Sequence, residues 1–86
     1  MNDIHLDCTG NMVGVGDYVR LMRPGRTTIV VGKVLVVSRL VTSYIRVAYY
    51  CEEKREIYSD IVYAQRVQLI RGAELTEIMI KYSDIL

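Results

Sequence analysis

The chain has one proline, one histidine and two cysteines among its 86 residues, and it has neither tryptophan nor phenylalanine. A single proline beside 51% hydrophobic and 24% charged residues excludes a disordered, collagen-like or low-complexity chain. The length suits one domain and not two. We therefore expect one globular domain over residues 1–86, too small for the extended cleft of a large-substrate enzyme.

Long hydrophobic runs are also missing. The longest apolar stretch, Ile29 to Val37, is interrupted by Gly32 and Lys33 and is far shorter than the roughly 20 residues that span a bilayer. The first eight residues include Asp3 and Asp7 and have no basic region followed by an apolar one, so they do not resemble a signal peptide. We expect a cytoplasmic protein that does not enter membranes.

Residues typical of catalysis or metal binding are scarce. His5 has no serine or cysteine partner at a recognisable spacing, so we expect a mobile surface histidine rather than a general base. Cys8 and Cys51 could form a disulfide or bind a metal, but they lie in no Cys-x-x-Cys motif or Cys/His cluster, and two free thiols are favoured. The sequence indicates no enzyme activity, no cofactor and no metal.

Short runs rich in valine, isoleucine and tyrosine alternate with turn signals. These runs predict antiparallel strands at residues 18–22, 29–38, 44–50 and 66–71. The loop from Arg23 to Arg26 and the charged segment from Cys51 to Arg55 separate some of them, and residues 59–62 are typical of a turn or a 3₁₀ step. Gly32 lies inside the longest run and favours a strand that bends between two sheets. We predict an all-β fold, a small five-stranded barrel.

Alternation with a period of two assigns the faces of two strands. In the first, Val19 and Leu21 point inward, while Tyr18 and Arg20 point outward. In the third, the presence of an arginine marks one face as solvated. The inward set there is Ile45, Val47 and Tyr49, and the solvated set is Tyr44, Arg46, Ala48 and Tyr50.

The period changes near the C-terminus. Leu75, Ile78, Met79 and Tyr82 follow helical spacing, which predicts a short amphipathic helix within residues 73–86. A helix of that length is marginal alone. It either caps the barrel or pairs with a partner protein or with a second copy of the chain.

Several segments carry a family resemblance. Residues 14–20 read Gly-Val-Gly-Asp-Tyr-Val-Arg, residues 32–34 read Gly-Lys-Val, and residues 45–47 read Ile-Arg-Val. Together they resemble small SH3-like barrels of the KOW and Tudor kinds over residues 7–71. The preceding lead, Asp7 to Val13, resembles that of small bacteriophage accessory proteins. The resemblance implies a small barrel, a binding role, and the host cytoplasm as location for a phage protein.

Enzymes of the same barrel class offer a weaker comparison. Plasmid-type dihydrofolate reductases share the opening motif and line a pore with a Val-Gln-Ile-Tyr run. The nearest stretch here is Arg55-Glu56-Ile57-Tyr58, in which glutamate replaces the glutamine and arginine the valine. These replacements argue against folate binding.

Acidic residues are absent from the whole segment between Tyr18 and Cys51, although the net charge is only +1. All ten acidic residues lie outside this segment. Tyrosine beside arginine offers stacking and phosphate contacts, a combination used for single-stranded nucleic acid and at interface hot spots. The basic residues of the segment are Arg20, Arg23, Arg26, Lys33, Arg39 and Arg46.

We therefore predict a non-enzymatic module that binds nucleic acid, or a protein of a nucleic-acid machine, through a Tyr/Arg face. The alternatives are a solvated face without function and contact with an acidic protein surface. A further alternative is a protein-interaction module, an inhibitor of a host protein or a homo-oligomer, that uses a sheet edge and the helix residues Leu75, Ile78, Met79 and Tyr82. The predicted face consists of Tyr18, Arg20, Arg23, Arg26, Tyr44, Arg46 and Tyr50.

Overall fold

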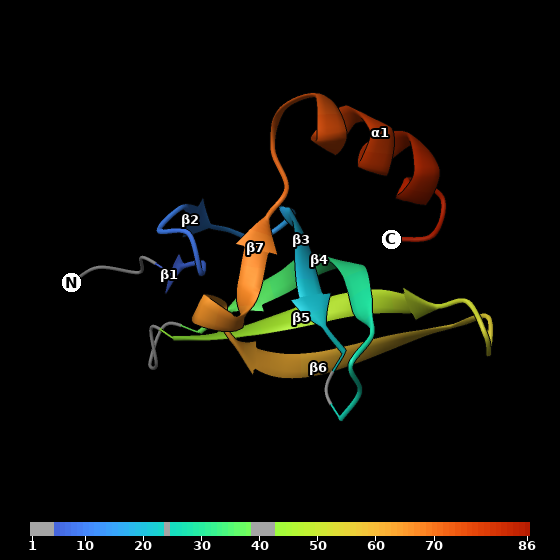
Figure 1. The fold of residues 1–86 in the computed structure, drawn as a ribbon, viewed down its shortest axis with the longest axis horizontal. Coiled ribbons are helices and arrows are strands. Elements are labelled where there is room, and N and C mark those ends of the chain that lie inside the picture. The colour runs from blue at the N-terminus through green and yellow to red at the C-terminus, as the bar shows by residue number, and fades with distance from the viewer. Residues whose placement is uncertain (1–4, 24, 39–42) are drawn as a thin grey trace.

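The computed structural model describes residues 5–23, 25–38 and 43–86 and shows a mostly β chain with one C-terminal helix (Figure 1). This coarse prediction is confirmed. No helix in the described ranges is long and apolar enough to cross a membrane. The elements are β1 (His5–Leu6), β2 (Met12–Val13), β3 (Tyr18–Met22), β4 (Ile29–Val37), β5 (Tyr44–Cys51), β6 (Glu56–Tyr63), a 3₁₀ turn (Ala64–Arg66), β7 (Val67–Leu69) and α1 (Gly72–Tyr82).

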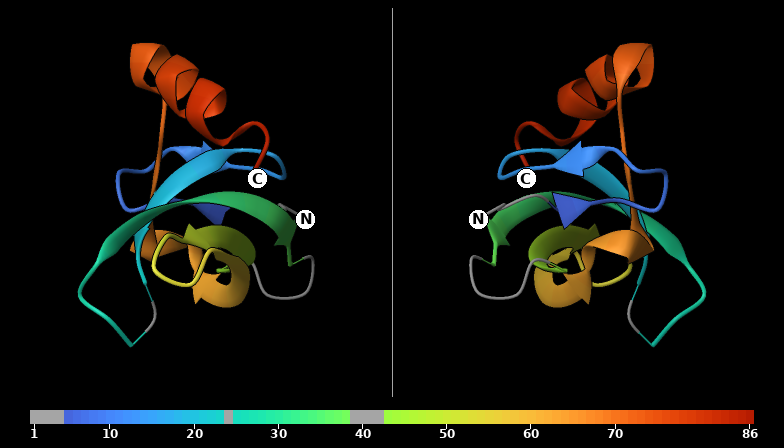
Figure 2. Two further views of the ribbon diagram at one scale, coloured as in Figure 1. Left: turned by 90° about the vertical axis from the view of Figure 1, so that its right-hand side faces the viewer. Right: turned by 90° about the vertical axis from the view of Figure 1, so that its left-hand side faces the viewer.

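One strongly curved antiparallel sheet forms the body of the molecule (Figure 2). Its strands lie in the order β6-β5-β4-β3-β7, so the last strand returns to pair with the first long one. Strands β1 and β2 form a separate two-stranded sheet. Among the described residues β6 and β7 are the two edges and are not paired with each other, so a closed barrel is not shown.

The strands β3, β4 and β5 lie where the valine- and tyrosine-rich runs predict them, but the predicted turn at residues 59–62 is wrong. These residues belong to β6, which pairs with β5 along its whole length, from Tyr44 opposite Tyr63 to Cys51 opposite Glu56. The polar Asp60 is accommodated because its carboxylate accepts a hydrogen bond from the Tyr49 hydroxyl. The 3₁₀ turn follows only after Tyr63.

The core consists of side chains from the inner face of this sheet. Val19 and Leu21 of β3 pack there with Ile45 and Val47, as the alternation predicts, and with Val34 of β4. All five side chains are buried, and burial of apolar side chains contributes about 1.5–3 kcal/mol each. The curved sheet therefore has one continuous apolar interior.

The outer face is less exposed than predicted at two positions. Tyr18 and Ala48 are buried, although both alternate with core residues. Lys33 lies opposite both in the strand register, and its Nζ sits 5.8 Å from the centre of the Tyr18 ring. The same Nζ donates a hydrogen bond of 3.1 Å to the carbonyl oxygen of Leu86. The chain after α1 thus covers part of a face that the strand pattern alone marks as solvated.

The N-terminal region corrects the prediction for His5 and confirms the one for the cysteines. His5 lies in β1, pairs with Val13 of β2 and is fully buried, so it is not a mobile surface residue. The β1 strand contacts the 3₁₀ turn. Cys8 is exposed and Cys51 buried, and both are free thiols.

Asp7 fixes this region to the sheet. Its Oδ1 accepts hydrogen bonds from the Thr9 N–H, the Thr9 hydroxyl and the Asn11 N–H, and its Oδ2 accepts one of 2.6 Å from the N–H of Leu69 in β7. Burial raises the pKa of Asp7, but the hydrogen bonds from Leu69, Thr9 and Asn11 outweigh it and hold the pKa below the ordinary value of 3.8. The charged carboxylate is therefore the form that the fold stabilises.

The Asp7→Asn variant is expected to be less stable by about 2 kcal/mol, because an amide has a single acceptor oxygen, so either the Leu69 N–H or the Thr9 and Asn11 N–H groups would lose their acceptor. The melting temperature should fall by about 10 °C. The carboxylate contributes stability above its unfolded pKa, and this contribution disappears as the pH falls through the lower folded pKa.

Thermal unfolding at several pH values checks this prediction. The difference between wild type and variant should be full at neutral pH and should shrink below about pH 4. Asp84→Asn, on an exposed position after α1, is the matched control and should change little. A difference that does not depend on pH would contradict the assigned role of the charge.

Candidate functional site

A groove with basic lining opens between the β3–β4 loop, the end of β6 and the 3₁₀ turn. It encloses 670 Å³ and is lined by the polar residues Arg23, Arg26, Gln65 and Arg66. No acidic residue is found among the described residues that line it. We call it the arginine groove. Its other lining residues are Leu21, Met22, Gly25, Ile61, Val62 and Tyr63.

Arg23 stands at the end of β3, where the loop holds its backbone. Its N–H donates to the carbonyl of Thr28, and its own carbonyl accepts from the N–H of Arg26, both at 2.9 Å. The guanidinium carbon lies 5.2 Å from the ring centre of Tyr58 and 5.9 Å from that of Tyr49. Two tyrosine rings therefore support the guanidinium, an arrangement favoured by the negative face of an aromatic ring.

Arg23 and Tyr49 keep fixed charge states. A hydrogen bond to Tyr49 raises the pKa of Arg23, so the guanidinium remains a cation. Burial and the hydrogen bond to Asp60 raise the pKa of Tyr49, so its phenol remains neutral. The Asp60 carboxylate accepts a hydrogen bond from the Tyr49 hydroxyl. The groove thus presents a permanent positive charge.

A stacked tyrosine pair extends the site along the sheet. The rings of Tyr44 and Tyr63 lie 4.7 Å apart at 26°, and their hydroxyls are joined by a hydrogen bond of 2.9 Å, which raises the pKa of Tyr44. Tyr63 is 45% exposed. A shallow cavity of 620 Å³ over β4, β5 and β6 has Tyr44, Arg46 and Ile61 in its lining. Because Ile61 also lines the arginine groove, the two hollows are neighbours.

The residues of the predicted Tyr/Arg face lie in two regions, and Arg23 lines a cavity in each of them. Arg23 and Arg26 line the arginine groove, and Tyr44 and Arg46 line the neighbouring cavity. Arg46 is exposed and donates a hydrogen bond of 3.4 Å to the Ser59 hydroxyl. Arg39 lies outside the described residues. The second group, on the outer face near α1, is Tyr18, Arg20 and Tyr50.

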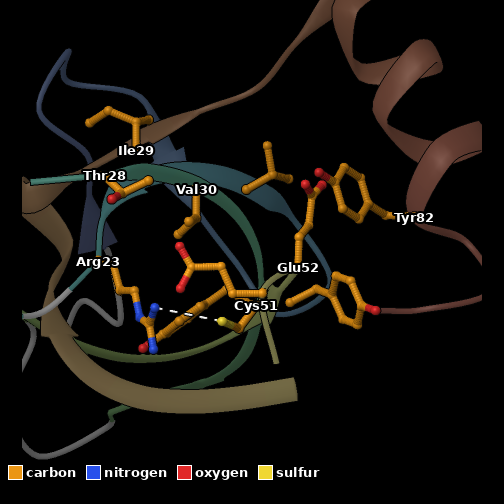
Figure 3. A pocket seen from close by; sticks show the side chains of 11 residues that line it. Arg23, Thr28, Ile29, Val30, Cys51, Glu52 and Tyr82 are labelled. Atoms are coloured by element: carbon orange, nitrogen blue, oxygen red, sulfur yellow. Dashed lines mark hydrogen bonds between the residues drawn. The ribbon is translucent and has the colours of Figure 1, made fainter. Parts of the chain in front are cut away.

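Two members of the second group, Arg20 and Tyr50, lie beside residues of α1. Arg20 forms an ion pair with Glu74 of α1. Tyr50 lines a third cavity, of 310 Å³, together with Tyr82 of α1 (Figure 3). The helix itself follows the predicted range and apolar spacing, but none of its residues is buried. Of the predicted helix face, Leu75, Ile78 and Tyr82 are half-buried and Met79 is exposed.

Sequence reasoning missed Arg66, Gln65 and Tyr63. Arg66 belongs to the 3₁₀ turn rather than to the last strand, and the pairing of Val67 with Leu21 brings this turn beside the end of β3. The signal in the sequence was a tyrosine and an arginine separated by only Ala64 and Gln65. This signal indicates a shared site only when the pairing of β7 with β3 is known, because that pairing places both residues near Arg23.

The described residues contain no group of three or more His, Cys, Asp or Glu side chains that could hold a metal ion. Comparison of the chain with protein-family models, with curated proteins and with solved structures finds no significant match. The functional argument therefore depends on the geometry of the arginine groove.

Proposed function

We propose that this chain is an SH3-like, non-enzymatic binding module that binds single-stranded nucleic acid through the arginine groove and the adjacent tyrosine pair. The strand order and the 3₁₀ turn before the closing strand support the barrel assignment. The observation that carries the binding proposal is the convergence of Arg23, Arg26 and Arg66 on one groove whose described lining has no acidic residue.

The chemistry of the lining favours a single strand over a duplex. Arginines bind phosphates, and exposed tyrosine rings accept stacked bases without regard to sequence. Reading a duplex requires an element that enters the major groove, usually a helix. The helix α1 carries Glu74 and Glu77, whose charge would repel a phosphate backbone. The apolar walls at Leu21 and Val62 suit the faces of unpaired bases.

Fluorescence anisotropy with labelled single- and double-stranded oligonucleotides tests the proposal. We expect preferential binding of single strands, weakening steeply between low and physiological salt, because phosphate contacts release counterions. Tyr63→Ala should lower the affinity about tenfold through lost stacking. Ile57→Ala, an exposed residue at the other end of β6, is the control and should bind as the wild type. Equal losses in both variants, or no binding at low salt, would contradict the proposal.

A second candidate is protein interaction through α1. The observation in its favour is the exposure of Met79 and Ile80, the latter at 76%. Light scattering of the wild type and of Ile80→Glu tests it. A mass above 9.9 kDa that returns to this value in the variant would support self-association through α1. A single-chain mass in both would oppose it.

A further inference from the structure

The helix α1 stands above the β3 side of the curved sheet and is joined to the sheet by the stretch after β7 (Figures 1 and 2). Beneath it and the residues that follow are Tyr18, Arg20 and Lys33, with Tyr50 close by. We call these four residues the covered face. We propose that α1 is a displaceable acidic cover, and that single-stranded nucleic acid competes with it for the covered face. This inference rests on the proposed function.

Both cations of the covered face are held by the C-terminal region. Arg20 pairs with Glu74, and their hydrogen bond raises the pKa of Arg20 and lowers that of Glu74. Lys33 donates to the carbonyl of Leu86. Tyr18 and Arg20 share one face of β3, and Lys33 lies opposite Tyr18 on β4. The helix thus occupies the same kind of Tyr/Arg surface that we assign to binding at the arginine groove.

The attachment of this cover is weak. No side chain of α1 is buried, and the ion pair that anchors it is partly exposed, with 32% and 49% of the two side chains accessible. Solvent-exposed ion pairs contribute little to stability. The helix begins at Gly72, whose φ of +69° is a conformation that glycine adopts readily. Because no residue of α1 is itself buried, displacing α1 exposes little buried apolar surface apart from the Tyr18 ring.

The contact between the end of α1 and the sheet is also incomplete. A cavity of 310 Å³ remains between Tyr82 and the β5–β6 hairpin, bounded by Tyr50, Glu52 and Cys51 (Figure 3). In this view the Tyr82 side chain reaches from the helix toward the Glu52 carboxylate. Protein interiors are normally close-packed, so a cavity at this contact indicates that the end of α1 does not pack tightly on the sheet.

A phosphate group can replace the carboxylate of Glu74 on Arg20. Both are oxyanions that the planar guanidinium binds through two parallel hydrogen bonds, and a polynucleotide offers several phosphates at once. When α1 moves away, Tyr18 and Tyr50 also become available for stacking. The covered face is then a second binding surface, which is open only when α1 is displaced. It lies on the side of β3 that faces away from the core.

The test compares Glu74→Gln with Glu77→Gln. Both substitutions remove one negative charge from α1, but only Glu74 holds Arg20, while Glu77 makes no ion pair within the described residues. Without nucleic acid, amide hydrogen exchange of α1 should accelerate in Glu74→Gln and not in Glu77→Gln. With a single-stranded oligothymidylate, Glu74→Gln should bind about threefold tighter or more than Glu77→Gln. For Glu74→Gln, the slope of the logarithm of the binding constant against the logarithm of the salt concentration should steepen by about 1, because one or two phosphate contacts are added.

Equal affinities and equal exchange rates in the two variants would overturn the cover while leaving the arginine groove intact. In that case the wild type would still bind single strands, and a variant with Arg23 and Arg66 substituted would not. Failure of all three proteins to bind would overturn the cover together with the proposed function. Faster exchange in Glu74→Gln without a gain in affinity would show that the released face does not bind nucleic acid, which also contradicts the inference.

Discussion

A variant with glutamine in place of Arg23, Arg26 and Arg66 should bind single-stranded nucleic acid about a hundredfold more weakly than the wild type. Each arginine lines the arginine groove and can contact one phosphate. For single strands the logarithm of the binding constant falls with the logarithm of salt by about 0.7 for each phosphate contact. Removing three phosphate contacts should therefore reduce the magnitude of this slope by about 2. Anisotropy titrations over a range of salt concentrations measure both quantities.

The matched control carries glutamine at Lys54, Arg55 and Lys81, three exposed positions outside the arginine groove. It loses the same net charge, so a similar loss of affinity would show that the binding is only a response to overall charge. Thermal unfolding of both variants separates binding from folding, because Arg23 also rests on two tyrosine rings. Equal binding by the two variants would refute the assignment of the groove.

Gly32→Ala should destabilise the domain by about 3 kcal/mol, a large part of the stability of a chain this small. Gly32 lies in the middle of β4, where β5 approaches closely. A Cβ there would clash with a methyl group of Val47 and would lie 2.8 Å from the carbonyl oxygen of Ala48. The methyl group could rotate, but the carbonyl belongs to the β5 backbone and the sheet would have to shift.

Thermal and urea unfolding check this prediction, with an expected fall in melting temperature of about 15 °C. Gly14→Ala is the control, since its Cβ would meet only a carboxylate oxygen of Asp17 at 3.8 Å, an ordinary contact distance. A stable Gly32→Ala protein would mean that the β4–β5 contact is looser than described.

Local patterns in the sequence were sufficient for much of the fold. The alternation in Tyr18–Met22 and Tyr44–Cys51 identifies the inward side chains correctly because both strands face one apolar interior. The helical spacing from Leu75 to Tyr82 locates α1. Burial on the outer face depends on a distant segment. The strand pattern does not reveal the hydrogen bond between Lys33 and Leu86, so its prediction that Tyr18 faces solvent is wrong.

The candidate site also combines residues that local patterns identify with residues that only distant strand pairing brings together. Arg23 and Arg26 were recognised because they are close in sequence and belong to an acid-free segment. Arg66 joins them only through the pairing of β7 with β3, which local periodicity does not predict. The ion pair of Arg20 with Glu74 likewise joins residues far apart in the chain. Because of this ion pair, Arg20 belongs to the covered face and not to the arginine groove.

Mapping of amide chemical shifts by NMR during titration with a single-stranded oligonucleotide tests the central claim most directly. Our account predicts that the largest shifts fall on the β3–β4 loop, on Tyr63 and on the 3₁₀ turn at Ala64–Arg66. Residues near Arg20 and on α1 should shift at higher concentrations, as the cover is displaced. Shifts confined to the β5–β6 hairpin or to β1 and β2, or no shifts at low salt, would contradict it.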